Sequence, residues 1–437
     1  MPKRLTQTRR HFLGSALATG TSLAARPTRA QNKPDKLVFV GDNGMWHDCL
    51  YKVVAPDFQK QTGIRVDFTA LPVDGLTARL QAELNGSGTG IDIVQWTGSY
   101  AGWLTPHMED HEKLLAAAAS RHPDFDWDDF MPSIRGMATW DGKLSGIPYR
   151  VTTGIFHYQK ALLEQVGFNK PPGTFAELQQ AAIACTKAGA PVNRYGLGYM
   201  GRQGSAMSDG FCSYMRSNGG DYYDPKTWEI FVNQPPAVEA LQFYGDLLTK
   251  YHCVVPDSLT WEWNETIAGG QNDRFAMVET LSPYGSLFND SKASRTAGKW
   301  AWSVVPGGKS LAQSRTYFGG WSLGVPKGGK NQEWAFEFIL MACSKKYMRR
   351  SMLLDNAPPR LSILNDPEMV AKFGWAPVAA QALRTAVLDP RDAIWATMEL
   401  QLRTGISAVL LGEKSAKAAL DQVASDWQRS IRRAGLK

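Results

Sequence analysis

The sequence predicts an α/β fold in which helices cover a parallel sheet. Strand-like and helix-like segments alternate over residues 36–95, and alternation on this short scale is typical of parallel sheets. The chain of 437 residues is long enough for a large core and for two or three domains. Hydrophobic residues make up 43% and charged residues 20%, which is the mix of an ordinary globular protein.

The alternation begins with a strand at Lys36–Val40. The helix that follows carries apolar residues at helical spacing and stops at Gly63. Residues 64–68 then alternate between apolar and polar side chains, the period of a strand with one solvated face. A second helix, over 76–85, leads through a glycine-rich loop into a buried strand at Ile91–Gln95.

Helical patterns dominate the rest of the chain. A helix is expected to start at Asn233–Pro236, because proline is tolerated in the first helical turn. Short strands are expected at 303–305 and 322–325. Two final helices are separated by Gly412, and no internal repeat is present.

The first 30 residues differ in charge from the rest. They contain six Lys and Arg and no acidic residue, so residues 31–437 hold 42 basic and 41 acidic groups despite the net charge of +7. This balance argues against a nucleic-acid partner. Arg9–Arg10 precede Phe12–Leu13 and a weakly apolar stretch, and Ala30 suits a cleavage site, so residues 1–30 are predicted to be a twin-arginine export signal. An ordinary secretory signal is the alternative, and both predict a soluble protein exported to the periplasm.

Three sequence patterns resemble chemical motifs without their structural context. Residues 196–201 fit GxGxxG but lack a preceding buried strand. Residues 320–324 fit GxSxG, yet no histidine follows His252. The acidic and histidine-rich segment 107–128 has no HExxH pattern. We therefore expect no catalytic residue, no cofactor and no metal.

The chain has five widely spaced cysteines and no CxxC pair. We expect them to be buried small apolar side chains, and the pairing of any disulfide stays open. They are Cys49, Cys185, Cys212, Cys253 and Cys343.

Polar and aromatic residues follow two of the predicted strands. Asp42 and Asn43 follow the first strand, and Trp96 and Ser99 follow the third. In open α/β sheets, ligands lie beyond the carboxyl ends of the strands. Carboxylate and amide groups bond sugar hydroxyls, and an indole ring covers the apolar face of a sugar. These residues are sugar-binding candidates, with a simple turn at residues 42–43 and a core position for Trp96 as the alternatives.

Several segments, in the same order, resemble the family 1 extracellular solute-binding proteins of ABC importers. The most specific is Trp140–Tyr149, which leads into Tyr158–Leu163 and then the helix start Pro171–Glu177. The other similar segments are Phe58–Val66, Ile91–Ile93, Asn218–Gly220, Ala237–Leu248, Ala276–Met277, Gly319–Gly320 and Gly412–Leu420.

This resemblance implies a type II periplasmic-binding-protein fold, in which two α/β lobes close around a ligand. The expected lobes are 31–149 with 279–325 and 150–278 with 326–437, joined by crossings near Pro148–Gly154, Glu279–Ser282 and Gly320–Pro326.

The resemblance also implies a ligand, partners and contact residues. It implies a monomer that binds a sugar or polyol without converting it and delivers it to the permease subunits of an ABC importer. The alternative from another class of protein is an exported enzyme. Arg150 and Arg360 lie near the same region and suit an acidic group, so a sugar acid or a phosphate ester is an alternative ligand. For Arg150, a salt bridge at the hinge is the other interpretation. A polyamine is another alternative ligand, but a polyamine site needs several carboxylates, and Asp42 is the only one that the sequence places in the cleft. The implied ligand-binding residues are Asp42, Asn43, Trp96, Ser99, Thr152 and Tyr284, with the nearby aromatics Trp46, Trp321 and Trp395.

Changing both Arg9 and Arg10 to lysine is expected to leave the precursor in the cytoplasm, because the twin-arginine route reads this pair. Cell fractionation and immunoblotting measure the distribution. Arg26→Lys makes the same change outside the pair and is expected to export normally. A normal periplasmic yield of the double variant would contradict the twin-arginine prediction.

Overall fold

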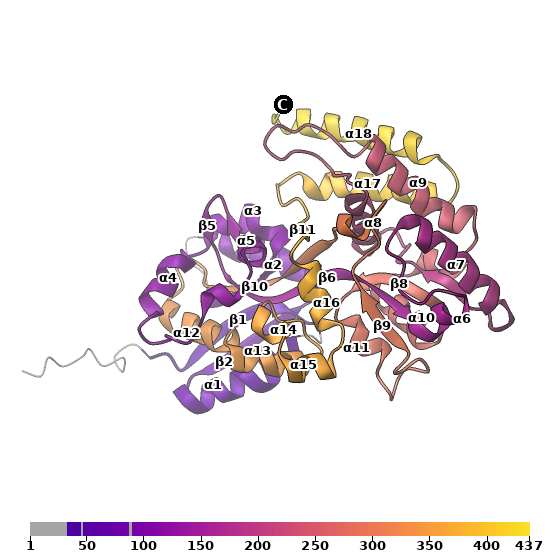
Figure 1. Cartoon of the computed structure of the whole chain (residues 1–437). Coiled ribbons are helices and arrows are strands. Elements are labelled where there is room, and N and C mark those ends of the chain that lie inside the picture. Colours follow the sequence, from indigo (N-terminus) through magenta and orange to yellow (C-terminus); the bar gives the residue numbers. More distant parts are fainter. Residues whose placement is uncertain (1–32, 45–46, 87–89) are drawn as a thin grey trace, which may run out of the picture.

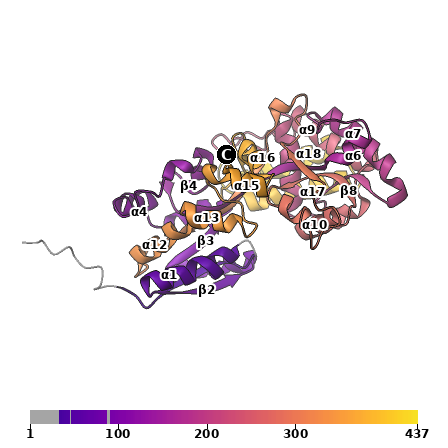
Figure 2. The same cartoon turned by 60° about the horizontal axis from the view of Figure 1, so that its bottom comes forward.

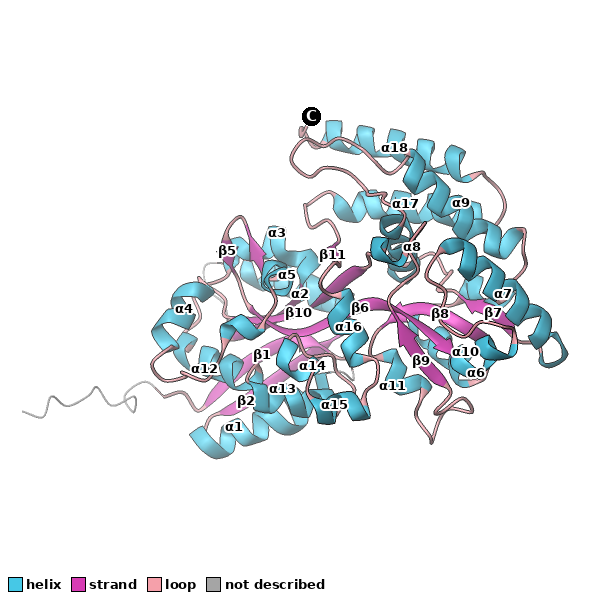
Figure 3. Cartoon of the chain, in the orientation of Figure 1, coloured by secondary structure: helices cyan, strands magenta, loops and turns pink. Residues whose placement is uncertain are grey.

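Two lobes share one continuous sheet in the computed structural model, which describes residues 33–44, 47–86 and 90–437 (Figure 1). The predicted export signal lies outside the described residues. Along the sheet the strand order is β2-β1-β3-β10-β6-β8-β7, with β9 paired to β6 and β11 paired to β10. Figure 3 shows β10 and β6 passing between the lobes, with helices around them.

The first lobe holds the start of the chain and a later group of helices. Its strands are β1 (Lys36–Asp42), β2 (Arg65–Leu71), β3 (Ile93–Thr97), β4 (Thr139–Trp140) and β5 (Lys143–Leu144). Its helices are α1 (Ala55–Thr62), α2 (Val73–Leu84), α3 (Ala101–Leu104), α4 (His111–Ala118), α5 (Pro132–Met137), α12 (Gln332–Ala342), α13 (Lys345–Met352), α14 (Leu361–Leu364), α15 (Pro367–Lys372) and α16 (Ala376–Ala382).

The second lobe is built from the middle and the end of the chain, and the rotated view separates it clearly from the first (Figure 2). Its strands are β7 (Tyr195–Gly198), β8 (Phe275–Leu281) and β9 (Trp300–Ser303). Its helices are α6 (Lys160–Gln165), α7 (Phe175–Gly189), α8 (Ser205–Ser217), α9 (Pro235–Thr249), α10 (Trp263–Gln271), α11 (Tyr284–Phe288), α17 (Trp395–Leu410) and α18 (Ala416–Arg433).

Two long strands connect the lobes. β6 (Ile147–Gln159) is buried along its whole length, and it enters the first core up to Ile155 and the second core from Phe156. β10 (Tyr317–Gly324) runs antiparallel to it and changes core between Tyr317 and Phe318. The lobes are therefore joined by sheet hydrogen bonds.

The parallel sheet predicted at the start of the chain is confirmed. β1 pairs in parallel with β2 and with β3, and α1 and α2 connect the three strands. α1 ends at Gly63, whose φ of +73° is a conformation that glycine adopts without steric cost. The expected helix start before Glu177 is also present, because Thr174 and Glu177 form a capping box at the start of α7.

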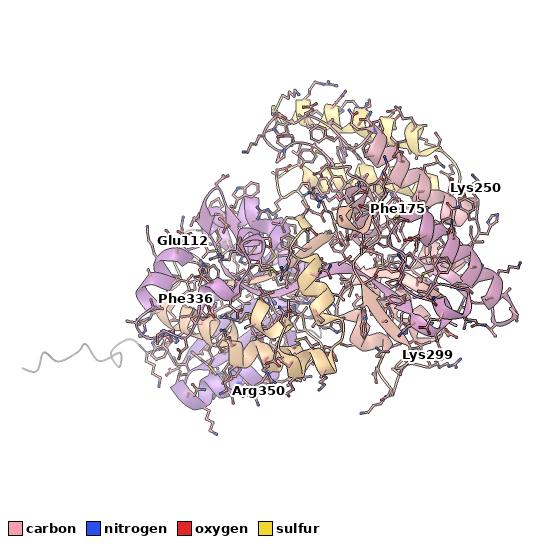
Figure 4. The ribbon with its side chains drawn as sticks, in the orientation of Figure 1. Glu112, Phe175, Lys250, Lys299, Phe336 and Arg350 are labelled. Carbon is pink, nitrogen blue, oxygen red and sulfur yellow. The ribbon has the colours of Figure 1, made fainter. Side chains whose placement is uncertain are left out.

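The two hydrophobic cores divide the chain differently from the expected lobe boundaries. Residues Ala335–Leu383, assigned from sequence to the second lobe, pack in the first core, where the Phe338 ring lies 6.3 Å from Phe39 and 5.3 Å from Phe58. Residues 279–300, assigned from sequence to the first lobe, contribute Leu281, Tyr284, Phe288 and Trp300 to the second core. Figure 4 labels Phe336 in the first lobe and Phe175 in the second. An apolar helix face predicts burial, but its pattern does not specify which core buries it.

All five cysteines are buried and free, as expected for small apolar side chains. Among the described residues, no helix combines the length and apolarity that a membrane crossing requires.

Arg360 fastens two segments of the first lobe and is fully buried. Its guanidinium donates hydrogen bonds to the carbonyl oxygens of Cys343, Phe125 and Asp126 at 2.6–2.9 Å, and it pairs with the Asp129 carboxylate at 3.2 Å. These protein groups occupy the side chain, so Arg360 does not contribute to a ligand site.

Replacing Arg360 with methionine is expected to lower the free energy of unfolding by about 3–5 kcal/mol, because it breaks a buried ion pair with Asp129 and leaves three carbonyl oxygens without their donor. Urea unfolding measures the change. Arg350→Met is the matched control, since Arg350 is 50% exposed and pairs with Asp57 at the surface, and it is expected to cost less than about 1 kcal/mol. Equal losses in both variants would contradict the role of Arg360.

Candidate functional site at the crossing strands

An open space lies beside Gly319, in the part of β10 that crosses between the lobes. A Cβ atom placed on Gly319 would have no other atom within 4 Å. Gly319 is also the one residue of β10 that is not buried. We call this region the Gly319 space.

Two aromatic side chains flank the Gly319 space. Because side chains alternate along a strand, Tyr317 and Trp321 lie on the same face of β10 as Gly319. Both are largely buried, with exposures of 3% and 8%. On the opposite face, Phe318 enters the first core, and a Cβ atom on Gly320 would lie 2.1 Å from the Arg150 carbonyl oxygen. The open space is therefore confined to one face of the strand.

Strand β6 contributes polar groups beside these aromatics. Thr152 is the cross-strand partner of Gly319, and Arg150 is the partner of Trp321. Cross-strand partners share a face of the sheet, so Arg150 and Thr152 border the Gly319 space. Burial lowers the pKa of Arg150 to about 10, while Tyr284, Asp42 and Tyr317 favour its charged form. Arg150 therefore stays positively charged at neutral pH.

At the first-lobe end of the site, Asp42 belongs to a buried hydrogen-bond network at the carboxyl end of β1. The Asp42 carboxylate lies 3.0 Å from Nε2 of His47 and accepts a hydrogen bond from the Gly44 backbone. Gln95 bridges the network, since its Oε1 accepts from the Asp42 backbone at 2.9 Å and its Nε2 lies 2.8 Å from Nδ1 of His47. The His47 ring packs edge-on at 5.7 Å from the ring of Trp321.

The charge state of His47 follows from this network. Burial lowers the pKa of His47, and the hydrogen bond to Asp42 opposes that shift only in part. His47 is therefore neutral at neutral pH, with the Nε2–H donating to Asp42 and Nδ1 accepting from Gln95. The Asp42 carboxylate also lies within electrostatic range of Arg150.

At the second-lobe end, carboxylates from several elements surround Tyr317. Asp209 lies on α8, Glu279 on β8, Asp389 after β11 (Val387–Leu388), and Glu399 on α17. Ser213 donates a hydrogen bond to Glu279 at 2.9 Å. Burial raises the pKa of Tyr317 well above its ordinary value, and Asp209, Glu279 and Asp389 raise it further, which places the phenol near these three carboxylates.

The same environment disfavours ionised carboxylates. Burial raises the pKa of Asp209 well above its ordinary value, and repulsion from Asp389, Glu399 and Glu279 adds to the shift. Burial also raises the pKa of Glu279 to about 8. Desolvation is the largest cause of both shifts, and groups with strongly perturbed pKa values are concentrated at functional sites.

Four of the sequence-predicted contact residues lie around the Gly319 space or its ends. Thr152 and Trp321 border it, and Asp42 lies at its first-lobe end within electrostatic range of Arg150. Tyr284, at the start of α11, is 3% exposed, and Arg150 counteracts the rise in its pKa that burial causes.

Asn43, Ser99 and Trp395 are placed differently. Asn43 and Ser99 are exposed, and the Asn43 backbone donates to Leu71. Trp395 packs in the second core, 4.9 Å from the ring of Tyr222. Trp46 lies outside the described residues.

Trp96 occupies the core position that was the alternative to a ligand contact. Its side chain is fully buried in the first core, and Cβ atoms on Gly146 and Gly324 would lie 2.8 and 3.2 Å from its Nε1. Because successive strand residues face opposite sides of the sheet, Gln95 points toward the site and Trp96 points away from it.

Several residues around the Gly319 space, unlike Trp321, were not among the predicted contacts. His47 and Gln95 carried no motif of their own. Tyr317 and Trp321 on either side of Gly319, at a period of two, were a usable signal for one face of a strand. The carboxylates of the second-lobe end had no local signal, because they come from segments nearly 200 residues apart.

The acidic and histidine-rich segment 107–128 is dispersed in the structure. His111 is buried and bonded to backbone groups, His122 lies 2.7 Å from Glu337, and Asp110 caps α4. Among the residues that the structure describes, no group of three or more His, Cys, Asp or Glu is arranged to hold a metal ion.

These features define a two-lobed binding protein of the type II periplasmic architecture. The chain belongs to the bacterial extracellular solute-binding proteins, since the family model with this description matches residues 54–375.

Comparisons with individual proteins agree with this assignment. A probable amino-acid ABC transporter periplasmic-binding protein of Sinorhizobium fredii is 23% identical over 387 residues, which cover 86% of this chain and 85% of the relative. The mannitol-binding protein of Pseudomonas aeruginosa is 22% identical over 401 residues, covering 85% and 87%. A solute-binding protein of Agrobacterium radiobacter K84, solved with ribitol, is 23% identical with a TM-score of 0.78, covering 91% of this chain and all of that one.

The pKa of Glu279 generates a prediction about stability. In the unfolded chain this acid has an ordinary pKa near 4.5, and burial raises it to about 8. Between these values the unfolded chain releases a proton that the folded protein keeps. Glu279 therefore makes its full contribution to the free energy of unfolding below pH 4.5. This contribution is lost as the pH rises from 4.5 through 8, by at most about 1.4 kcal/mol per pH unit.

Glu279→Gln, which stays neutral, is expected to be less sensitive to this pH change than the unmodified protein. Urea unfolding at pH 5 and pH 8 measures the difference. Glu413→Gln, in the exposed turn after α17, is expected to keep the original pH dependence. Parallel pH profiles for Glu279→Gln and the unmodified protein would show that Glu279 does not titrate in this range.

Proposed function

We propose that this protein binds a sugar or polyol in the Gly319 space and delivers it to the membrane subunits of an ABC importer. The observation that carries the proposal is the open space between Tyr317 and Trp321 on β10, bordered by Arg150 and Thr152 on β6. Because β6 and β10 both cross between the lobes, a molecule held there contacts the two lobes at once.

The groups around this space suit a polyhydroxylated solute. Aromatic rings cover the apolar C–H faces of such molecules, while carboxylate, guanidinium and hydroxyl groups bond their hydroxyls. Asp42 is already oriented by His47 and Gln95, so little side-chain entropy is lost when it accepts a hydrogen bond. A small number of fixed polar groups among aromatics is typical of small-molecule sites.

The relatives support the same class of solute. The names of two of them include mannitol and ribitol, and another is described as part of an ABC transporter. We further propose that the protein acts as an exported monomer and does not convert its solute. The predicted export signal over residues 1–30 and the family's description as solute-binding proteins support this part.

Calorimetric titration of the mature protein with mannitol, ribitol and a panel of hexoses tests the proposal. A true ligand also raises the free energy of unfolding, by about 2.7 kcal/mol at 100 times its dissociation constant. Failure of every sugar and polyol to bind the folded protein at millimolar concentration would refute the proposed function.

Trp321→Ala and Trp96→Ala form a matched pair that tests the placement of the site. Trp321→Ala removes a ring that flanks the Gly319 space, so affinity for the bound sugar or polyol is expected to fall about 5- to 150-fold. Trp96→Ala removes a core side chain, so the free energy of unfolding is expected to fall by about 3–5 kcal/mol. Its folded fraction is expected to bind normally. Calorimetry and urea unfolding on both variants measure the two properties.

The reverse pattern of effects in these two variants would show that the solute binds elsewhere. If Trp96→Ala weakens binding while Trp321→Ala leaves it unchanged, the solute contacts the opposite face of β3 and β10, and the Gly319 space is not the site.

A further inference from the structure

The two ends of the Gly319 space differ in charge balance. At the first-lobe end, Asp42 is buried within electrostatic range of Arg150, so one acid is matched by one base. At the second-lobe end, four carboxylates (Asp209, Glu279, Asp389 and Glu399) are gathered with two arginines, Arg216 and Arg403. This end therefore holds an excess of acidic groups.

The two arginines are committed to two of the four carboxylates. Arg403 pairs with Glu399, which also accepts a hydrogen bond from Ser208 at 2.6 Å. Arg216 lies 3.7 Å from Asp389. Among the ion pairs of the described residues, none includes Asp209 or Glu279.

Asp209 and Glu279 therefore have no ion-pair partner among the described residues, and only Arg403, which is paired with Glu399, lies within electrostatic range of Asp209. Glu279 is 5% exposed and has Ser213 as its hydrogen-bond donor, while Asp209 is half-buried. Burying a carboxylate without a cation costs several kcal/mol unless the group takes up a proton. A cationic group that reaches this place would remove that cost.

An independent observation points to a ligand at the same place. The Tyr317 hydroxyl is buried, and none of the described residues forms a hydrogen bond with it. Its surroundings include Asp209 and Glu279, and its ring borders the Gly319 space. An unsatisfied buried hydroxyl is uncommon in folded proteins and calls for a partner that the protein itself does not supply.

We propose that the solute is a polyhydroxylated primary amine, such as an amino sugar or amino polyol, whose ammonium group lies between Asp209, Glu279 and Tyr317. An ammonium group has three N–H donors, which matches the two carboxylates and the phenol oxygen. The hydroxyl-bearing part of the solute then extends along the Gly319 space toward Thr152, Arg150 and Trp321. This inference rests on the proposed function and specifies its solute.

The test compares solutes that differ in one group. Sorbitol and 1-amino-1-deoxysorbitol differ only in a hydroxyl against an ammonium, and glucose and glucosamine form a second pair. Calorimetry at pH 7 in the presence of EDTA measures each affinity. The amine of at least one pair is expected to bind tenfold or more tightly than its neutral partner.

Variants of Asp209 and Tyr317 test whether these residues cause the preference for an amine over its neutral partner. Asp209→Asn is expected to weaken amine binding tenfold or more and to change binding of a neutral solute less than threefold. Tyr317→Phe, which removes only the hydroxyl, is expected to weaken amine binding about three- to tenfold without lowering the melting temperature. Asp257→Asn is the charge control, because Asp257 is 61% exposed and pairs with Arg274 at the surface, and it is expected to bind like the unmodified protein.

Four outcomes would overturn the inference. If the neutral solutes bind as tightly as the amines, the inference is wrong and the proposed function stands. The same holds if Asp209→Asn weakens the binding of the amine and of its neutral partner equally. Tighter binding of L-threonine than of either amine would replace the polyhydroxylated amine with an amino acid. Failure of every neutral and amino solute to bind would overturn the inference and the proposed function together.

Discussion

The antiparallel pairing of β6 with β10 is the constraint on which the rest of the structure depends. These strands hydrogen-bond from Ile147 and Leu323 to Thr153 and Phe318 while passing from one lobe to the other. Their backbones approach so closely that Gly320 has no room for a side chain. The pairing fixes which residues share a face, and so it places Tyr317, Gly319 and Trp321 together at the junction of the lobes.

The two ends of the site differ in how completely their polar groups are satisfied. At the first-lobe end, neutral His47 and Gln95 hold the Asp42 carboxylate in a buried network with defined donors and acceptors. At the second-lobe end, Asp209 and Glu279 have no ion-pair partner among the described residues, and the Tyr317 hydroxyl has no hydrogen-bond partner there. Natural proteins depart from full satisfaction chiefly where function requires it, and this imbalance is the basis of the proposed amine preference.

The chain passes through the first lobe twice, which affects how that lobe is assembled. Residues 37–155 and 335–383 form one core, while the sequence between them folds mainly into the second lobe. Arg360 strengthens this arrangement, because it ties the late segment to the carbonyls of residues 125 and 126. The first lobe therefore depends on contacts between segments more than 200 residues apart, and such contacts form slowly during folding.

The sequence by itself determined the local elements and the type of fold. Period-two and helical patterns located β1, β2 and β3 with the helices between them, because those patterns depend only on neighbours in the chain. Ordered family segments indicated two lobes, and polar residues at strand ends located Asp42. Only the tertiary structure decided which core receives α12–α16, which face of β3 carries Trp96, and which distant carboxylates meet Tyr317. Those outcomes depend on strand register and on contacts across the chain, and a local pattern encodes neither.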